Sequence, residues 1–498
     1  MATEKETSVN SALNGHSTST NNQTQDDGMP FIRKLTFGCG HVFNDLAASM
    51  WFSYLLIYFN KVLNFNSVLA GYLMLAGQIC DGLSTTFVGI ESDRINGCCF
   101  LGKRKSWHLV GTFCVLLSFP FIFNPCITCE NEPDSIQLIY YISFILVFQF
   151  GWANVQISHL SLIPELTRNK HERVSLNSIR YAFTVLSNLA VYIIFWIIFN
   201  MNVGEKLGRK DSGKFELLVF IVTGIGVFFS FIFHTFSPEK MYSTPAVTES
   251  QEKDGLLSCT RSIMTWKDWW YEPQFYMIGV IYMGTRLFLN ISQIYLPLYV
   301  LDTIQLNKKY IAIVPLVVYI FSFLTTLIMK LVNSTIGAKL TFVIGLIISL
   351  SFSIWILFIP INSMQVFGAA AFNGIGGSII LITSLSLTTE LIATNTESAA
   401  FVYGSLSLID KCANGIAVVV IQHLLAMNTG NCCGDCLCDN RLILFVVPGG
   451  AAIIAFIFLC LLGPQKIGVR KRTKFYVPYT QNTPTESSNP INNQQVDV

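Results

Sequence analysis

Six charged residues lie inside long apolar segments of this chain and constrain its fold more than any other feature. A charged side chain at the centre of a membrane helix costs about 2.5–3.5 kcal/mol on insertion scales, so such residues usually face a partner or a water-filled path. Their spread over several segments predicts a polar cavity within a helical membrane bundle, which is typical of a transporter. The six residues are Asp45, Asp81, Arg180, Arg286, Asp410 and Lys411.

Composition places the chain among polytopic membrane proteins. Of its 498 residues, 52% are hydrophobic and 12% are charged, whereas soluble domains carry about 25% charged residues. The net charge of +2 and the lack of a basic tract give no indication of nucleic-acid binding. We expect no ATP-driven pumping, no enzyme activity and no cofactor, because the sequence contains no Walker loop and no hydrolase triad with supporting context.

Twelve membrane helices are expected at about 20 residues per span. They cover 35–59, 67–90, 106–124, 136–162, 175–200, 215–235, 273–301, 308–330, 336–360, 364–388, 397–426 and 441–463. The predicted organisation is an all-α membrane protein of two six-helix halves, 33–236 and 269–463, with a cytosolic central loop at 237–268. A disordered cytosolic N-terminus (1–32) and a cytosolic tail (464–498) flank them.

Basic residues predict the orientation. Most of the 32 lysines and arginines fall on the side that holds both termini and the central loop, and such loops face the cytosol. The loop at 201–214, with four basic residues on the other side, fits this rule least well.

A short internal repeat supports the division into halves. SHLSLIPEL at 158–166 and TSLSLTTEL at 383–391 are identical at five of nine positions, and they end the fourth and tenth spans. This offset of six spans predicts two parallel halves with a binding site near the midplane between them.

The first and second spans each carry an aspartate. Asp45 shares a helix face with His41, and we expect it to bind substrate or a proton, the alternative being a fixed contact between helices. Asp81 shares a face with Thr85, and its oxygens could form a cation or proton site. The alternative for Asp81 is a salt bridge that locks two helices together, and a bridge that breaks on protonation would do both.

Asp410 and Lys411 are neighbours in the eleventh span and point about 100° apart on a helix. We expect Lys411 to pair with Asp81 across the two halves, where its ammonium can stand in for a cation. The pair is predicted to act in coupling or gating, and a purely structural role is the alternative.

Arginine binds carboxylates through two parallel hydrogen bonds. For Arg286, which shares a face with Asn290, a substrate carboxylate and Asp45 are equally good candidate partners. Arg180 opens the fifth span, and we expect it to pair with Glu165 as a cytosolic brace.

Two loop motifs have regulatory interpretations. Asp93 and Arg94 at the end of the second span, followed by Gly102–Lys105, can form a cytosolic gating latch. In the central loop, Glu252 precedes the pair Leu256–Leu257 by four residues, the form that endolysosomal sorting adaptors read.

The cysteines of two outer loops favour disulfides over a metal site, because such loops lie outside the reducing cytosol. They are Cys126, Cys129, Cys432, Cys433, Cys436 and Cys438.

These residues together resemble a known family. GIESDR and GKRK resemble the signature between helices two and three of the major facilitator superfamily. The order of Asp45, Asp81, SLIP at 161–164 and Lys411 resembles melibiose-type sugar:cation symporters. The segments GHVFNDLAASMWFSYLL, FQFGWANVQISHLSLIPEL and AFVYGSLSLIDKCANG are most similar to a lysosomal and melanosomal branch of the superfamily. That resemblance implies a transporter that imports cysteine into these organelles and affects pigmentation.

The chain departs from the melibiose pattern at two positions. Thr85 stands where those carriers have a second aspartate, and Gln156 stands at their sugar-binding aspartate. Proton coupling, or no ion coupling, therefore fits better than sodium coupling. We expect Asp45, Gln156, Arg286 and Asn290 to bind the substrate. A sugar or lipid-headgroup:cation symporter, and a non-transporting membrane scaffold or receptor, are the alternative interpretations.

Overall fold

The computed structural model describes residues 29–94, 102–130, 132–167, 170–200, 207–237, 267–392, 399–428, 440–463 and 465–468. Within these ranges the α-helices and short turns of 3-10 and π-helix account for all regular structure. The helices are α1 Phe31–Cys39, α2 Val42–Ile57, α3 Ser67–Arg94, α4 Lys103–Ile122, α5 Asp134–Leu166, α6 Lys170–Asn200, α7 Ser212–Phe236, α8 Pro273–Leu298, α9 Tyr310–Ile336, α10 Ala338–Phe358, α11 Gln365–Ile392, α12 Ala399–Asn428 and α13 Asn440–Leu462.

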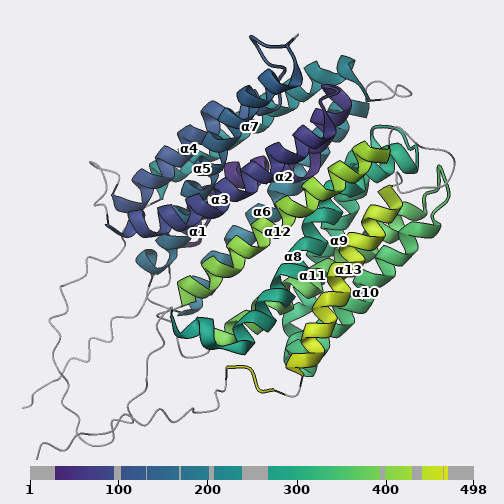
Figure 1. Ribbon diagram of the computed structural model, residues 1–498. Helices are drawn as coiled ribbons and strands as arrows, with labels where there is room; N and C mark the ends of the chain where they lie inside the picture. Colours follow the sequence, from purple (N-terminus) through teal and green to yellow (C-terminus); the bar gives the residue numbers. More distant parts are fainter. Residues whose placement is uncertain are drawn as a thin grey trace, which may run out of the picture.

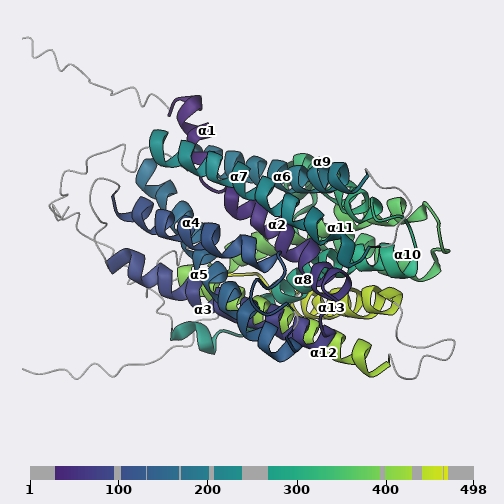
Figure 2. The same ribbon diagram turned by 90° about the horizontal axis from the view of Figure 1, so that it is seen from above.

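Among the described residues, twelve helices are long and apolar enough to cross a membrane. They match the twelve predicted spans to within a few residues, except that the first begins at Val42 and the sixth at Arg209. α1 begins at Phe31, two residues inside the segment that was predicted to be a disordered tail. The helices form two groups, α1–α7 and α8–α13, which lie side by side in Figure 1. In Figure 2, α2 and α8 lie together at the centre of the bundle. The α2 span is the most buried of the twelve, as expected for a helix enclosed by its neighbours.

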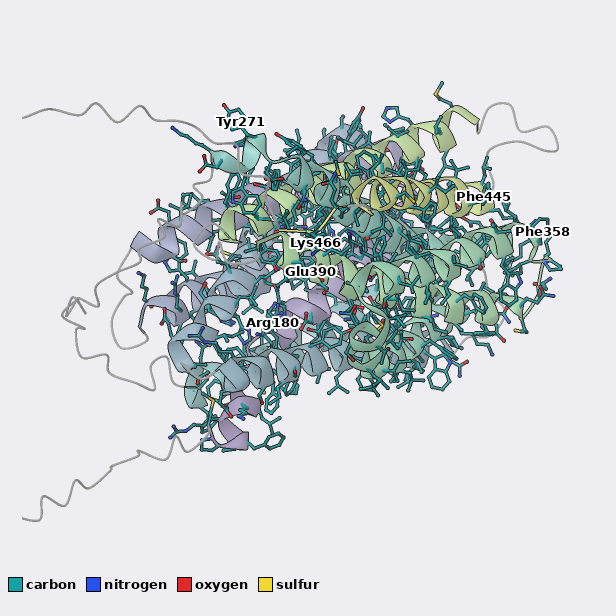
Figure 3. All side chains as sticks on the ribbon, turned by 90° about the horizontal axis from the view of Figure 1, so that it is seen from below. Arg180, Tyr271, Phe358, Glu390, Phe445 and Lys466 are labelled. Atoms are coloured by element: carbon teal, nitrogen blue, oxygen red, sulfur yellow. A yellow bond between two sulfur atoms is a disulfide. The ribbon has the colours of Figure 1, made fainter. Side chains whose placement is uncertain are left out.

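The helical bundle has two ends that would lie on opposite sides of a membrane. The tail end is where α1 begins and α13 ends, and the far end is the opposite one. In Figure 3, Tyr271 lies at the tail end, whereas Phe358 and Phe445 lie at the far end.

The prediction of one continuous first span over 35–59 was wrong. The helix breaks between α1 and α2 at Gly40–His41, although no proline is present. Two buried histidines stabilise the break, because His108 Nε2 donates to the Gly40 carbonyl at 2.9 Å and His159 Nε2 donates to the Phe37 carbonyl at 2.8 Å. Such side-chain donors replace the hydrogen bonds that a helix terminus loses.

The first helix of each half ends in the same way at the far end. α2 runs into a π-helical turn at Tyr58–Val62, and α8 runs into one at Tyr299–Thr303. Each turn is followed two residues later by a residue with positive φ, Asn64 at 54° and Gln305 at 58°. This shared geometry is structural support for the repeat that the sequence predicts.

Small residues let two helices of the first half approach closely. A Cβ added to Gly151 in α5 would lie 2.9 Å from the Gly111 carbonyl oxygen in α4, and one added to Gly111 would lie 2.7 Å from the Gly151 carbonyl oxygen. Contact through small residues is a common way for membrane helices to pack, because it brings the two backbones together.

The basic residues of the predicted latch bind within the first half. Arg104 Nε donates to Glu165 Oε1 at 3.0 Å, and Lys105 Nζ donates to the Ser237 carbonyl at 2.9 Å. Asp93 and Arg94 form the last turn of α3, but their side chains lie outside the described part.

Cys126 and Cys129 form a disulfide in the loop between α4 and α5. The predicted sorting residues and the remaining loop cysteines lie outside the described residues, namely Glu252, Leu256, Leu257, Cys432, Cys433, Cys436 and Cys438.

Candidate functional site

A cavity of about 420 Å³ lies between the two halves, a size typical of small-molecule sites. All four residues that the sequence predicted as substrate contacts line it, from α2, α5 and α8: Asp45, Gln156, Arg286 and Asn290. Aromatic side chains form much of the remaining wall: Phe52, Trp152, Tyr181, Tyr192 and Tyr319. The cavity can therefore hold a small ligand with both charged and apolar parts.

The first half supplies an acid–base network on one wall. Asp45 Oδ2 lies 2.9 Å from His41 Nδ1 and accepts from Thr184 Oγ1 at 2.9 Å. The other ring nitrogen, His41 Nε2, lies 2.8 Å from an Arg180 amine. Because arginine only donates, the network runs from Arg180 through His41 to Asp45.

The role predicted for Arg180 as a brace against Glu165 is wrong. Glu165 bonds Arg104 instead, and Arg180, which is labelled in Figure 3, lines the cavity. Its Nε is buried and has no hydrogen-bond partner in the described structure. Arg180 thus has one donor that is not used within the protein. The sequence signal for its place at the cavity is that it is one of the charges inside the apolar segments.

The second half carries the opposite arrangement. Arg286 Nε on α8 donates to Asp410 Oδ2 on α12 at 2.9 Å, and Asn414 Nδ2 donates to Asp410 Oδ1 at 2.6 Å. Of the two predicted partners of Arg286, Asp45 is not the residue that its Nε binds in this structure, and the substrate carboxylate stays a prediction. Asp410 is almost fully buried, so this pair fixes α8 against α12.

The two halves therefore present related networks with inverted charges. In the first half the negative residue, Asp45, is on the first membrane span (α2) and the positive residue, Arg180, is on the fifth (α6). In the second half the positive residue, Arg286, is on the first membrane span (α8) and the negative residue, Asp410, is on the fifth (α12). A ligand with one positive and one negative group can lie between such walls with each group near its counter-charge.

A second polar cluster joins the halves at α3 and α12. Lys411 Nζ lies 2.8 Å from Asp81 Oδ2 and donates to Thr85 Oγ1 at 3.1 Å. Thr85 in turn donates to Asp81 Oδ1 at 3.2 Å. The expected pairing of Asp81 with Lys411 is present, and the ammonium group occupies the oxygen-lined position.

Contacts at the far end also connect the halves. Lys61 Nζ binds Asp302 Oδ1 at 2.8 Å, and Lys308 Nζ binds Asp211 Oδ1 at 3.0 Å. These ion pairs hold the far-end tips of the two halves together.

Comparison with known proteins places the chain in a family. The sequence profile of the family described as MFS/sugar transport protein matches residues 36–435. The chain belongs to this family. It is 43% identical over 457 residues to human "Major facilitator superfamily domain-containing protein 12", which covers 88% of this chain and 95% of the human protein.

More distant matches agree on class and fold. A Synechocystis protein named as an uncharacterized symporter is 29% identical over 174 residues, 34% of this chain and 31% of that protein. The inward-open structure of the xylose transporter XylE from E. coli superposes with a TM-score of 0.60, covering 86% of this chain and 96% of XylE at 14% identity. The chain has the major facilitator fold of two six-helix halves.

Members of this family are transporters, so the protein is a multi-pass membrane secondary transporter and not an enzyme. Among the described residues no group of three His, Cys, Asp or Glu side chains could hold a metal ion. Charged, amide and aromatic groups line the cavity.

Proposed function

We propose that this protein is an alternating-access transporter that moves cysteine from the cytosol into the lumen of lysosomes and melanosomes, with effects on pigmentation. The observation that carries this proposal is the inverted charge pattern of the two cavity walls. A zwitterionic amino acid has one ammonium and one carboxylate, and both find counter-charges in the cavity: Asp45 on one helix and an arginine within reach.

Arg180 is the better partner for the substrate carboxylate. Arg286 is already bound to the buried Asp410, whereas Arg180 lines the same cavity and its Nε has no hydrogen-bond partner. Gln156 and Asn290 supply amide groups beside these charges and can hydrogen-bond the rest of a small polar ligand. Arg286 then contributes to substrate binding mainly through the electrostatic field of its charge, which Asp410 holds in place.

Asp81, Thr85 and Lys411 act as the gating element in this proposal. Their cluster bridges α3 and α12, which belong to different halves, so breaking it would let the halves separate there. Asp410 is next to Lys411 and anchors α12 to α8 through Arg286. Asp93 and Arg94 would complete the latch at the tail end.

The proposed orientation places the tail end in the cytosol, in agreement with the distribution of basic residues. The far end would then face the lumen, where its ion pairs hold the two halves together and favour loading of cysteine from the cytosol. Glu252, Leu256 and Leu257 would recruit endolysosomal sorting adaptors from the cytosolic side.

A sugar or lipid-headgroup:cation symporter is the second candidate. Trp152 Nε1 donates to Gln156 Oε1 at 3.1 Å in the cavity wall, and an indole beside an amide also suits a hydroxyl-bearing ring. The ammonium of Lys411 in the Asp81 site disfavours the cation part of this candidate, because a sodium ion would have to displace it.

Uptake of radiolabelled cysteine into proteoliposomes tests the proposal. We expect saturable uptake that does not change when sodium is replaced by potassium, and strong loss of uptake with Asp45→Asn and Arg180→Gln. Leu117→Ala, in an exposed residue of α4, is the matched control at equal protein abundance. Sodium-dependent uptake of a sugar with no cysteine uptake would favour the second candidate.

A further inference from the structure

The tautomer of His41 follows from its two partners. Arg180 has only N–H donors, and one of its amines lies 2.8 Å from His41 Nε2, so this nitrogen is an acceptor and carries no proton. In the neutral ring the proton is then on Nδ1. This nitrogen lies 2.9 Å from Asp45 Oδ2, but the angle between them is unfavourable for a hydrogen bond. Arg180 at 2.8 Å, with Asn44 Nδ2 more distant at 3.5 Å, therefore occupies the one atom of His41 to which a further proton can add.

The ring of His41 has a fixed position at the start of α2. It is the residue after the helix break, and the ring of His159 from α5 lies 5.5 Å away, centroid to centroid. The charged and titratable groups that face it are Asp45 on α2, Arg180 on α6 and His159 on α5. Behind His159 lie His108 of α4 and His234 of α7, and Arg286 of α8 lies across the cavity.

We propose that His41 Nε2 binds one proton when a substrate carboxylate takes Arg180. A carboxylate can accept from Arg180 through Nε and an amine in parallel, the strongest geometry for this pair. Nε has no partner now but is buried, so the guanidinium must turn to present it to a carboxylate, and this turn breaks its contact with His41. A proton from water then adds to the freed Nε2 lone pair, and the Nδ1 proton stays toward Asp45.

This exchange couples the binding of the substrate carboxylate to the binding of the proton, and each favours the other. The bound carboxylate neutralises Arg180 and the added proton charges His41, so a zwitterionic amino acid and its proton together raise the net charge of the cavity by one. While Arg180 donates to Nε2 the proton is excluded, and while Nε2 is protonated Arg180 is repelled toward the carboxylate. By reciprocity, each ligand strengthens the binding of the other. The cavity thus binds an amino acid and one proton together, with His41 as the proton site, separate from the Asp81–Lys411 cluster.

The inference rests on the proposed function, because it requires a substrate that carries a carboxylate. Calorimetric titration of the full-length protein in nanodiscs with cysteine, at mildly acidic pH in phosphate and in imidazole buffer, measures proton uptake from the difference between the two binding enthalpies. His41→Gln is the test variant because glutamine can still accept from Arg180 and donate to Asp45, yet takes no proton. His423→Gln, at the far end of α12, is the matched control.

We expect up to one proton taken up per cysteine bound in the wild type and in His423→Gln. His41→Gln should still bind cysteine at neutral pH, where the proton contributes least, but take up no proton. Cysteine binding without proton uptake by the wild type, or uptake retained in His41→Gln, overturns the inference and leaves the proposed function intact. Failure of the wild type to bind cysteine overturns the proposed function and the inference with it.

Discussion

Lys61 and Asp302 occupy equivalent positions in the two halves and bind each other. Each is the fourth residue of the π-helical turn that ends the first helix of its half, and Lys61 Nζ lies 2.8 Å from Asp302 Oδ1. The Lys61–Asp302 pair, together with Lys308–Asp211, thus holds the two halves together at the far end. It would break and re-form once in each transport cycle.

Reversing the charge of Lys61 should weaken the contact between the two halves at the far end. About a third of each side chain is exposed, and an exposed pair contributes about 0.2–1 kcal/mol. We expect Lys61→Asp to slow net cysteine uptake a few-fold, because like charges now face each other. Lys61→Asp with Asp302→Lys should recover most of the rate. Initial uptake rates in proteoliposomes test this, and no recovery in the double variant would show that the pair is not a gate.

The Asp81–Lys411 pair should show strong coupling in a double-mutant cycle. Each single neutralisation leaves a mostly buried charge without its partner, which costs about 3 kcal/mol in comparable sites. We expect Asp81→Asn and Lys411→Gln each to lower the thermal midpoint of the purified protein by several degrees. The double variant should lie closer to wild type than either single variant. Additive losses would mean that the two charges do not stabilise each other.

Loss of the ion pair between Arg286 and Asp410 should destabilise the protein more than loss of an exposed ion pair. Asp410 is almost fully buried and has Arg286 as its only cationic partner among the described ion pairs. Arg286→Gln should therefore destabilise the protein by about 3–5 kcal/mol, and Arg286→Lys should recover part of the loss. Differential scanning fluorimetry measures both, with Arg209→Gln in an exposed far-end ion pair as the control. Equal midpoints for Arg286→Gln and the control would contradict the assignment.

The contact of α4 with α5 should not tolerate a methyl group. An added Cβ on Gly151 would lie 2.6 Å from Cys114 Cβ and 2.9 Å from a backbone oxygen, so Gly151→Ala must push the helices apart. A loss of about 1–3 kcal/mol is expected for such overpacking. Gly224→Ala, where nothing lies within 4 Å, should be neutral or stabilising. Unfolding in increasing sodium dodecyl sulfate compares the two variants.

Sequence reasoning located the helices because a membrane span needs a fixed length of apolar residues, which a single sequence displays directly. It also paired Asp81 with Lys411, since both lie at similar depth in helices of different halves. The gating role of that pair stays a prediction.

The partners of Arg180 and Arg286 could not be found in the same way. Pairing depends on the rotation of each helix about its axis and on its tilt, and a shift of one residue turns a side chain by about 100°. For this reason Arg286 meets Asp410, and Arg180 meets His41. The break at Gly40 is stabilised by His108 and His159, which come from distant helices, and no local signal marks it.

The most direct test of the central claim is an experimental structure of the protein with cysteine bound. The account predicts cysteine in the cavity between the halves, with its carboxylate within hydrogen-bond distance of the Arg180 guanidinium and its ammonium toward Asp45. His41 Nε2 should then no longer contact Arg180. Cysteine bound elsewhere, or bound in the cavity with its carboxylate on Arg286 while Arg180 still contacts His41, would contradict it.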